Sequence, residues 1–209
     1  MPDPTAAPPN VSTVCVSDDD LVVRARQGDP AAFGALVDRH RSAVYRAALA
    51  ALGSHAEAED AAQEAFLLAY RRLNGFRGDA SFKTWLLTIT WHQAINRRRA
   101  LTRILRRLVT AKGAEAEAHD AMLASVASAG PTPEAAAVQQ ELQQAVREAI
   151  NGLTAKLRDT LVLAQSGQYS YEEIASMVNA PVGTIKWRVS EARRLIKQRL
   201  RERGFGEQR

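Results

Sequence analysis

Helical periodicity runs through residues 18–203 and constrains the fold more than any other feature of this chain. Apolar residues recur three and four positions apart in one segment after another, and they alternate with period two over no useful length. Asp29-Pro30 marks a helix start with a cap and a first-turn proline, and Ser54 with Glu57 matches a capping box. We therefore predict an all-α protein with no sheet.

Composition divides the expected helices into two domains. Residues 1–17 are rich in Pro, Ala and Ser without periodicity, which is typical of a disordered N-terminal tail. Residues 18–108 form the first helical domain, and residues 134–203 form the second. Between them, residues 109–133 are rich in Ala, Glu and Ser and end in Gly-Pro-Thr-Pro, which predicts a flexible linker.

The residue types present exclude several classes of function. One cysteine, Cys15, and four scattered histidines provide neither a disulfide framework nor a Cys-rich zinc site. No nucleophile–base constellation and no Gly-rich phosphate loop is apparent, so we expect no enzyme activity, no metal and no cofactor. No apolar run approaches the ~20 residues that span a bilayer, and no secretion signal is apparent. We expect a soluble, cytoplasmic protein without membrane insertion.

Positive charge gathers in two separate blocks. Residues 94–112 hold seven basic side chains and no acidic one, and residues 186–203 hold eight basic side chains against two acidic ones. One such run is most simply a solvated face, whereas two in a small chain favour a polyanionic partner, most simply nucleic acid.

Residues 171–190 contain the parts of a helix-turn-helix motif. Asn179 tolerates the left-handed conformation that ends a helix, and Pro181 prevents simple continuation. The next helix has a predicted buried stripe at Val182, Ile185, Val189, Ala192 and Ile196. Its opposite face carries cations, an indole and hydrogen-bonding groups, namely Lys186, Trp187, Ser190, Glu191 and Arg194. That mixture suits a helix in the DNA major groove better than the ordinary exposed face of a bundle.

The helix expected between Ser54 and about residue 74 presents a different face. Opposite its alanine stripe lie Asp60, Gln63, Glu64 and Leu67. Taken alone this is most simply a solvated face, but carboxylates, an amide and a leucine suit a protein partner better than nucleic acid.

Aromatic residues precede the first basic block. We expect Phe82, Trp85, Leu86 and Ile89 to share a core face, and Trp91 to point away from it near the arginines. Aromatic rings beside cations are what unpaired bases need for stacking and phosphate neutralisation, although core packing alone explains most of the rings.

Three segments, in this order, resemble the extracytoplasmic-function (ECF, group IV) sigma factors of bacteria. They are AEDAAQEAFLLAYRRL at 58–73, FRGDASFKTWLLTI at 76–89, and LTAKLRDTLVL with YEEIASMVNAPVGTIKWRVSEAR at 153–163 and 171–193. The resemblance spans about three quarters of the chain. It implies a σ2-like helical bundle and a σ4-like helix-turn-helix domain joined by a flexible linker. It also implies a promoter-specificity subunit, with catalysis left to RNA polymerase.

The resemblance further implies roles for individual residues. Contacts with the β′ clamp helices of core RNA polymerase fall on Asp60, Gln63, Glu64 and Leu67. Contacts with the promoter −10 element fall on Phe76, Arg77, Asp79, Ser81, Trp91, His92, Asn96, Arg97, Arg98 and Arg99. Contacts with the −35 element fall on Thr184, Lys186, Trp187, Arg188, Ser190, Glu191 and Arg194. The second domain would also rest on the polymerase β flap, and an anti-sigma factor is a further partner that the family suggests.

Three residues depart from the family pattern. Trp187 stands where a small residue is usual, Glu191 where an arginine is common, and His92 where an amide is common. Because glutamate accepts from cytosine N4 whereas arginine prefers guanine, we expect a shifted −35 sequence. The alternative function is a stand-alone helix-turn-helix regulator that binds a palindromic duplex without polymerase. Two other functions explain less of the sequence: an enzyme that acts on a flipped base, and an interaction protein that uses only the helix expected between Ser54 and about residue 74.

Overall fold

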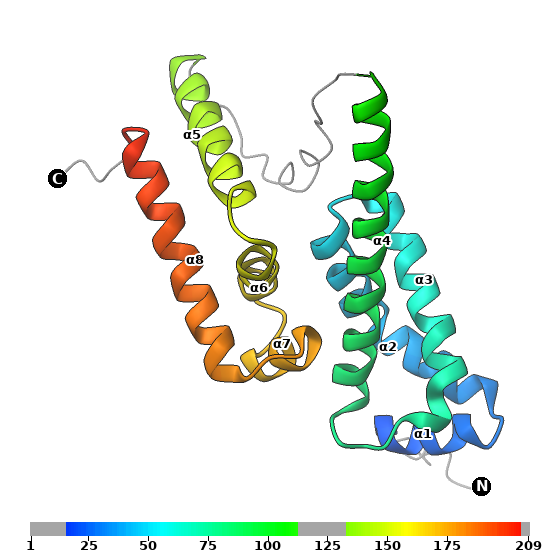
Figure 1. Cartoon of the computed structure of the whole chain (residues 1–209). Coiled ribbons are helices and arrows are strands. Elements are labelled where there is room, and N and C mark those ends of the chain that lie inside the picture. Colours follow the sequence, from blue (N-terminus) through cyan, green and yellow to red (C-terminus); the bar gives the residue numbers. More distant parts are fainter. Residues whose placement is uncertain (1–15, 113–132, 206–209) are drawn as a thin grey trace, which may run out of the picture.

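The computed structural model describes residues 16–112 and 133–205, and every regular element in these two ranges is a helix (Figure 1). The all-α prediction is confirmed. The first bundle contains α1 (Asp18–Arg26), α2 (Pro30–Leu52), α3 (His55–Arg72), the 3₁₀ turn η1 (Leu73–Gly75) and α4 (Phe82–Lys112). The second contains α5 (Pro133–Asn151), α6 (Ala155–Gln165), α7 (Tyr171–Val178) and α8 (Val182–Glu202).

Two sequence predictions concern segments at the edges of the described ranges. Most of the predicted tail at residues 1–17 and most of the predicted linker at residues 109–133 lie outside the described residues. Helix α4 continues four residues past the expected domain end at 108, and α5 begins at the last residue of the expected linker.

Local signals set several helix ends as the sequence predicts. The Asp29 carboxylate accepts hydrogen bonds from the backbone N–H groups of Ala31 and Ala32, at 2.9 and 3.2 Å, and caps α2. Ser54 caps α3, but its hydroxyl accepts from the Glu57 N–H at a long 3.5 Å, and the Glu57 side chain is used elsewhere. A complete capping box starts α7 instead, formed by Ser170 and Glu173.

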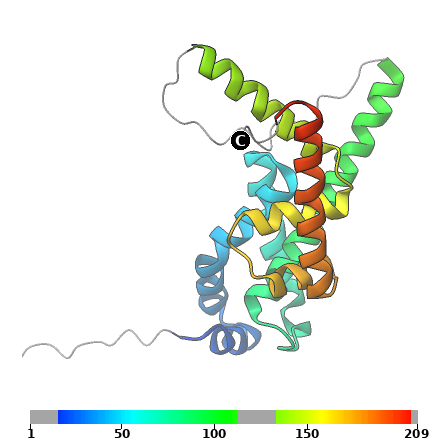
Figure 2. The same cartoon turned by 90° about the vertical axis from the view of Figure 1, so that its left-hand side faces the viewer.

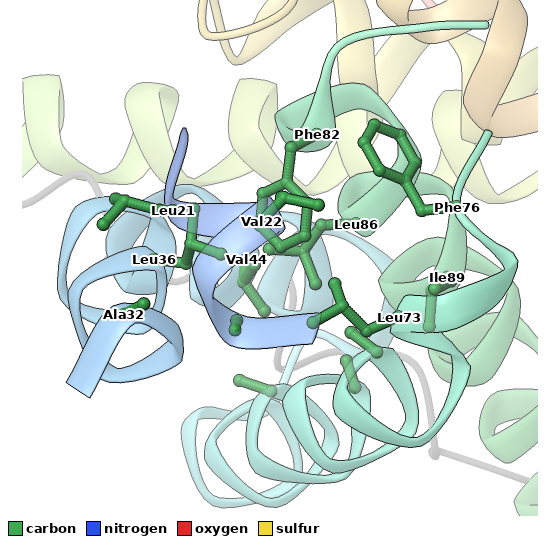
Figure 3. Close-up of a cluster of buried hydrophobic side chains, with 14 residues drawn as sticks. Leu21, Val22, Ala32, Leu36, Val44, Leu73, Phe76, Phe82, Leu86 and Ile89 are labelled. Carbon is green, nitrogen blue, oxygen red and sulfur yellow. The ribbon is translucent and has the colours of Figure 1, made fainter. Parts of the chain in front are cut away.

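A core of large apolar side chains joins the four helices of the first bundle (Figure 3). Leu36 and Val44 of α2 meet Phe82 and Leu86 of α4, and all four side chains are fully buried. Phe76, from the loop between η1 and α4, packs its ring against Phe82 with the ring centroids 5.9 Å apart. The loop is therefore anchored to the core through Phe76, while its remaining residues from Arg77 to Ser81 are exposed.

The helix-turn-helix prediction is confirmed by the backbone of α7 and α8. Asn179 adopts φ 49° and ψ 61° and ends α7 in the left-handed conformation, and Pro181 caps α8. Of the predicted stripe on α8, Ile185, Val189 and Ala192 are buried, whereas Val182 and Ile196 are half-buried.

The second bundle packs directly on the first, with α7 against α4 and α6 against α2 (Figures 1 and 2). One buried apolar cluster spans both bundles, with Leu87, Trp91 and Ala94 from α4 and Ile174 and Met177 from α7 among its members. As expected, Trp91 is not part of the core around Phe82 and Leu86, but it is buried in this second cluster and is not open to nucleic acid. The second bundle covers that side of α4 and leaves only 3% of Trp91 exposed.

We expect Leu36→Ala to lower the free energy of unfolding by about 2–5 kcal/mol, because it opens a cavity in a filled core. Leu67→Ala is the control, since Leu67 is 59% exposed and its truncation should change stability by less than ~0.5 kcal/mol. Urea denaturation followed by circular dichroism measures both values. Equal destabilisation by the two variants would contradict this account of the core.

Candidate nucleic-acid and partner interfaces

Helix α3 turns a polar ridge away from the bundle. Its alanines Ala58, Ala61, Ala62, Ala65 and Ala69 are buried, so the opposite side faces solvent. That side carries the residues we call the acidic ridge: Asp60, Gln63, Glu64 and Leu67, all exposed. An exposed leucine beside carboxylates and an amide is the composition that the sequence predicts for a protein-binding face.

Arg97 of α4 reaches across to the acidic ridge. Its guanidinium lies 2.5 Å from a Glu57 oxygen and 3.2 Å from oxygens of both Asp60 and Glu64. Partial burial lowers the pKa of Arg97, but the hydrogen bond that its guanidinium donates to Glu57 and the three nearby carboxylate charges outweigh it and raise the pKa. The ridge is therefore partly neutralised from within the chain. The sequence pattern does not predict this contact, because the partners are 33–40 positions apart.

A hollow of about 290 Å³ lies beside the loop between η1 and α4. The loop supplies Arg77 and Asp79 to its lining, α4 supplies Thr84, Trp85 and Thr88, and α7 supplies Ser176. An indole with hydroxyl, carboxylate and guanidinium groups around it can both stack on a planar base and hydrogen-bond to its edge.

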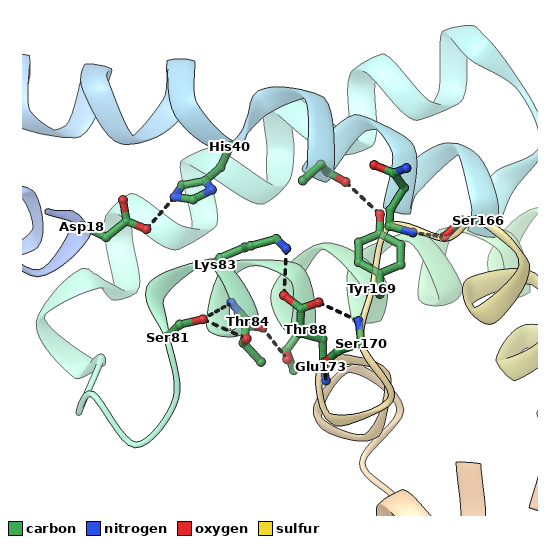
Figure 4. A network of polar contacts seen from close by, with 12 residues as sticks. Asp18, His40, Ser81, Lys83, Thr84, Thr88, Ser166, Tyr169, Ser170 and Glu173 are labelled. Carbon is green, nitrogen blue, oxygen red and sulfur yellow. Dashed lines mark hydrogen bonds and ion pairs between the residues drawn. The ribbon is translucent and has the colours of Figure 1, made fainter. Parts of the chain in front are cut away.

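Ser81 has a structural task at the edge of this hollow. Its hydroxyl accepts a hydrogen bond from the Thr84 N–H at 3.1 Å and lies 2.9 Å from the Thr84 hydroxyl (Figure 4). It thereby satisfies an N–H group in the first turn of α4.

The remaining predicted −10 residues on α4 fall into two groups. His92, Asn96 and Arg99 are exposed and lie on the solvent side of the helix. Trp91, Arg97 and Arg98 are engaged within the chain: Trp91 is buried, Arg97 contacts the acidic ridge, and Arg98 is paired with Asp159 of α6. Six of the ten predicted −10 residues are exposed in this conformation, namely Arg77, Asp79, Ser81, His92, Asn96 and Arg99.

The recognition helix α8 presents its predicted outer face to solvent. Lys186, Trp187 and Ser190 are exposed, with Trp187 at 61%, whereas Thr184 and Arg188 are half-buried at the edges of the face. A large indole in solvent is costly unless it has a partner, so the face has the composition of a binding surface.

Glu191 and Arg194 form a pair on this face. The guanidinium of Arg194 donates to both carboxylate oxygens of Glu191, at 2.7 and 2.8 Å. This hydrogen bonding lowers the pKa of Glu191 and raises that of Arg194, so both stay charged. Glu191 is thus held as an acceptor in a fixed orientation.

The sequence pattern does not predict two further features of the second bundle. An apolar groove of about 360 Å³ between α5, α6 and α8 is lined by Val146, Ile150, Leu161, Ile196, Leu200 and Phe205. The sequence does contain a signal for this groove, because the aromatic residue Phe205 follows shortly after the end of α8. The contacts of Asp159, Tyr169 and Glu173 with the first bundle have no local signal, because their partners lie on distant parts of the chain.

Two absences hold for the residues that the structure describes. No helix in residues 16–112 or 133–205 is long and apolar enough to cross a membrane. Over the same ranges, no group of His, Cys, Asp and Glu side chains is arranged to hold a metal ion.

Comparisons with known proteins match both bundles. The family model Sigma-70 region 2 matches residues 36–104, and the model Sigma-70, region 4 matches residues 143–196. Among solved structures, the sigma factor RpoE in complex with the anti-sigma factor NepR from Bartonella quintana aligns with TM-score 0.54 and 26% identity, covering 81% of this chain and 96% of that one. CnrH in complex with the cytosolic domain of CnrY aligns with TM-score 0.57 and 22% identity, covering 88% and 97%, and supports the fold.

Curated relatives align over nearly their whole length. RNA polymerase sigma-H factor of Pseudomonas aeruginosa is 37% identical over 88% of this chain and 93% of its own. ECF RNA polymerase sigma factor SigW of Bacillus subtilis is 32% identical over 87% and 95%, and ECF RNA polymerase sigma-E factor of Escherichia coli K12 is 34% identical over 88% and 95%. These matches favour a polymerase subunit over a stand-alone regulator. The chain belongs to the ECF group of the sigma-70 family, whose members bind RNA polymerase and direct promoter-specific initiation of transcription.

Proposed function

We propose that this sigma factor docks on core RNA polymerase through the acidic ridge and chooses promoters with its two bundles. The first bundle binds the −10 element and the second binds the −35 element. The polymerase carries out catalysis, in the cytoplasm. The observation that carries the proposal is the pairing of an exposed acidic ridge on α3 with an exposed cationic and aromatic face on α8. One face suits a protein partner and the other a polyanion.

The −35 assignment is supported by the exposed end of α8. Lys186, Trp187 and Ser190 lie in the N-terminal half of a 21-residue helix, where recognition helices enter the major groove. Glu191, already fixed by Arg194, has the chemistry to accept a hydrogen bond from cytosine N4.

The −10 assignment is supported by the hollow beside the loop. Trp85 offers a stacking surface for a displaced base, Asp79 can accept a hydrogen bond from the edge of that base, and Arg77 can pair with the phosphate of its nucleotide. Stacking contributes about 1–3 kcal/mol per base, enough to offset part of the cost of unpairing.

The apolar groove between α5, α6 and α8 is the place we propose for the polymerase β flap or for an anti-sigma factor. Its floor is apolar, and Arg193, Lys197 and Arg201 contribute to its lining, so an apolar helix with acidic flanks would fit. The similarity to RpoE, solved with the anti-sigma factor NepR, supports an anti-sigma factor as the competing occupant.

Run-off transcription on a promoter library, with bacterial core polymerase and the purified chain, tests the proposal. Sequence-specific initiation that requires both components is the expected result. Specific binding of a palindromic duplex by the chain alone, without stimulation of polymerase, would favour the stand-alone regulator instead.

We expect reversal of two ridge charges, in Asp60→Lys/Glu64→Lys, to weaken binding of core polymerase about 10-fold or more, because the partner meets cations where it needs carboxylates. Fluorescence titration of core polymerase measures the affinity. Asp38→Lys on α2, an exposed site away from the ridge, is the control and should bind like the wild type.

Lysines at positions 60 and 64 also repel Arg97, so they can lower stability as well as weaken polymerase binding. An uncharged substitution on the ridge separates these two effects. Leu67→Ala removes an exposed contact of the ridge without touching Arg97, and we expect it to weaken polymerase binding while the thermal midpoint stays unchanged. Wild-type affinity of both ridge variants would refute docking through this face.

We expect Glu191→Gln to change the preferred base at one −35 position, because an amide both donates and accepts where the carboxylate only accepts. Sequencing of transcripts from the promoter library reads out the preference. Glu202→Gln, the same substitution at an exposed site near the end of α8, should leave the preference unchanged. Identical preferences for Glu191→Gln and the wild type would show that Glu191 does not read a base.

A further inference from the structure

Helix α1 packs beside the loop that lines the hollow proposed for a −10 base. Its buried residues Leu21, Val22 and Ala25 belong to the same core cluster as Leu73 and Phe76, which lie at the start of that loop (Figure 3). The match to Sigma-70 region 2 begins at residue 36, after α1 has ended, so that match by itself gives the helix no role.

The last residue of α1, Arg26, connects the helix directly to the loop. Its guanidinium donates from Nε to the Leu73 carbonyl at 3.1 Å and from Nη2 to the Phe76 carbonyl. The guanidinium carbon also lies 5.9 Å from the centroid of the Phe76 ring, within the range of a cation–π contact. One side chain therefore holds both the 3₁₀ turn η1 and the first residue of the loop that follows it.

The loop is anchored at both of its ends. At the first end, the Phe76 N–H donates to the Leu73 carbonyl at 3.1 Å, and Arg26 donates to the same carbonyl. At the second end, the Ser81 hydroxyl accepts a hydrogen bond from an N–H group of α4 at 3.1 Å. Residues 77–80 lie exposed between these two anchors. The first anchor depends on a side chain from another helix, so the loop sequence alone does not provide it.

Helix α1 is in turn attached to α2 at its other end. His40 Nε2 lies 2.7 Å from one Asp18 oxygen (Figure 4), and Arg39 donates to the other Asp18 oxygen at 2.5 Å. Arg39 also donates to the Val16 carbonyl at 2.8 Å. The helix that carries Arg26 is thus held by α2 at its first turn, and it can serve as a fixed support for the loop.

We propose that Arg26 is a positioning residue for the −10 site and holds the loop in the conformation that receives a displaced base. The inference rests on the proposed function of the hollow. Arg26 acts through the backbone of η1 and Phe76 and thereby sets where Arg77 and Asp79 lie in the hollow. A loop that is ordered before the strand arrives binds it more tightly, and it adapts less readily to a wrong base.

Two arginines of α1 allow this geometry to be tested separately from charge. Arg26→Lys keeps the positive charge but replaces the planar set of donors, which reaches two carbonyls at once, by a single ammonium group. Arg24 pairs instead with Asp29, at 2.8 Å, at the turn between α1 and α2. Arg24→Lys makes the same change on the same helix and is the matched control.

Hydrogen exchange in the free full-length chain tests the anchor. The Phe76 amide, which donates to the Leu73 carbonyl, is followed by NMR. We expect it to exchange about 3-fold or more faster in Arg26→Lys than in the wild type or in Arg24→Lys, because the turn opens more often. Equal exchange in the three proteins would contradict the anchor.

Base discrimination by the holoenzyme tests the positioning role. Core polymerase with the chain binds a fluorescein-labelled single strand from the −10 region of a promoter found by run-off transcription, and the same strand with its most strongly discriminated base replaced. We expect the ratio of the two affinities to fall about 3- to 10-fold in Arg26→Lys and to keep its wild-type value in Arg24→Lys. A role in stability alone would lower the thermal midpoint and leave this ratio unchanged.

A second variant guards against an effect peculiar to lysine. Arg26→Met keeps an unbranched stem beside Phe76 and removes both hydrogen bonds, so we expect it to lower the ratio at least as much as Arg26→Lys. The preference at the −35 element should stay unchanged in both variants, because the second bundle does not contact Arg26.

The outcomes separate this inference from the proposed function. If the wild-type holoenzyme discriminates between the two strands and Arg26→Lys does so equally well, the positioning role is overturned and the −10 assignment stands. If the wild-type holoenzyme shows no discrimination at any base of the strand, the −10 assignment itself is refuted.

Discussion

Helix α4 connects the two bundles, and two of its consecutive arginines, Arg97 and Arg98, contact neighbours on different sides of it. Successive side chains on a helix are about 100° apart, so Arg97 and Arg98 serve different neighbours. Arg97 meets three carboxylates on α3, whereas Arg98 meets Asp159 of the second bundle. Helix α4 is thus a core helix of one bundle and packs against the other, and it also carries residues that we propose for the −10 interface.

Features encoded within about twenty residues are predictable from the sequence of this chain, and features that depend on distant partners are not. The cap at Asp29, the left-handed Asn179 and the buried stripe of α8 follow from local rules. The burial of Trp91 does not, because it requires α7, more than 70 positions later. The sequence does not predict the pairing of Arg97 with the acidic ridge for the same reason, since helical spacing does not indicate which helix lies alongside α4.

The contact between Arg97 and the acidic ridge connects two surfaces that the sequence suggests are separate. A cationic group that docks on Asp60 and Glu64 must compete with Arg97 for the same carboxylates. These pairs are partly exposed, and such pairs contribute only ~0–1 kcal/mol each, so the competition is not costly. Docking of a protein partner on α3, as we propose, would therefore change the charge available on α4, where we propose part of the nucleic-acid interface.

The apolar and the charged contacts between the two bundles contribute to the interface in different ways. The apolar contacts between α4 and α7 supply the attraction, because burying Leu87 and Trp91 removes apolar surface from water. The buried Arg98–Asp159 pair loses much of its Coulombic gain to desolvation, so it contributes more to register than to stability. The apolar contacts therefore hold the second bundle against α4, and the buried ion pair sets its position along the helix.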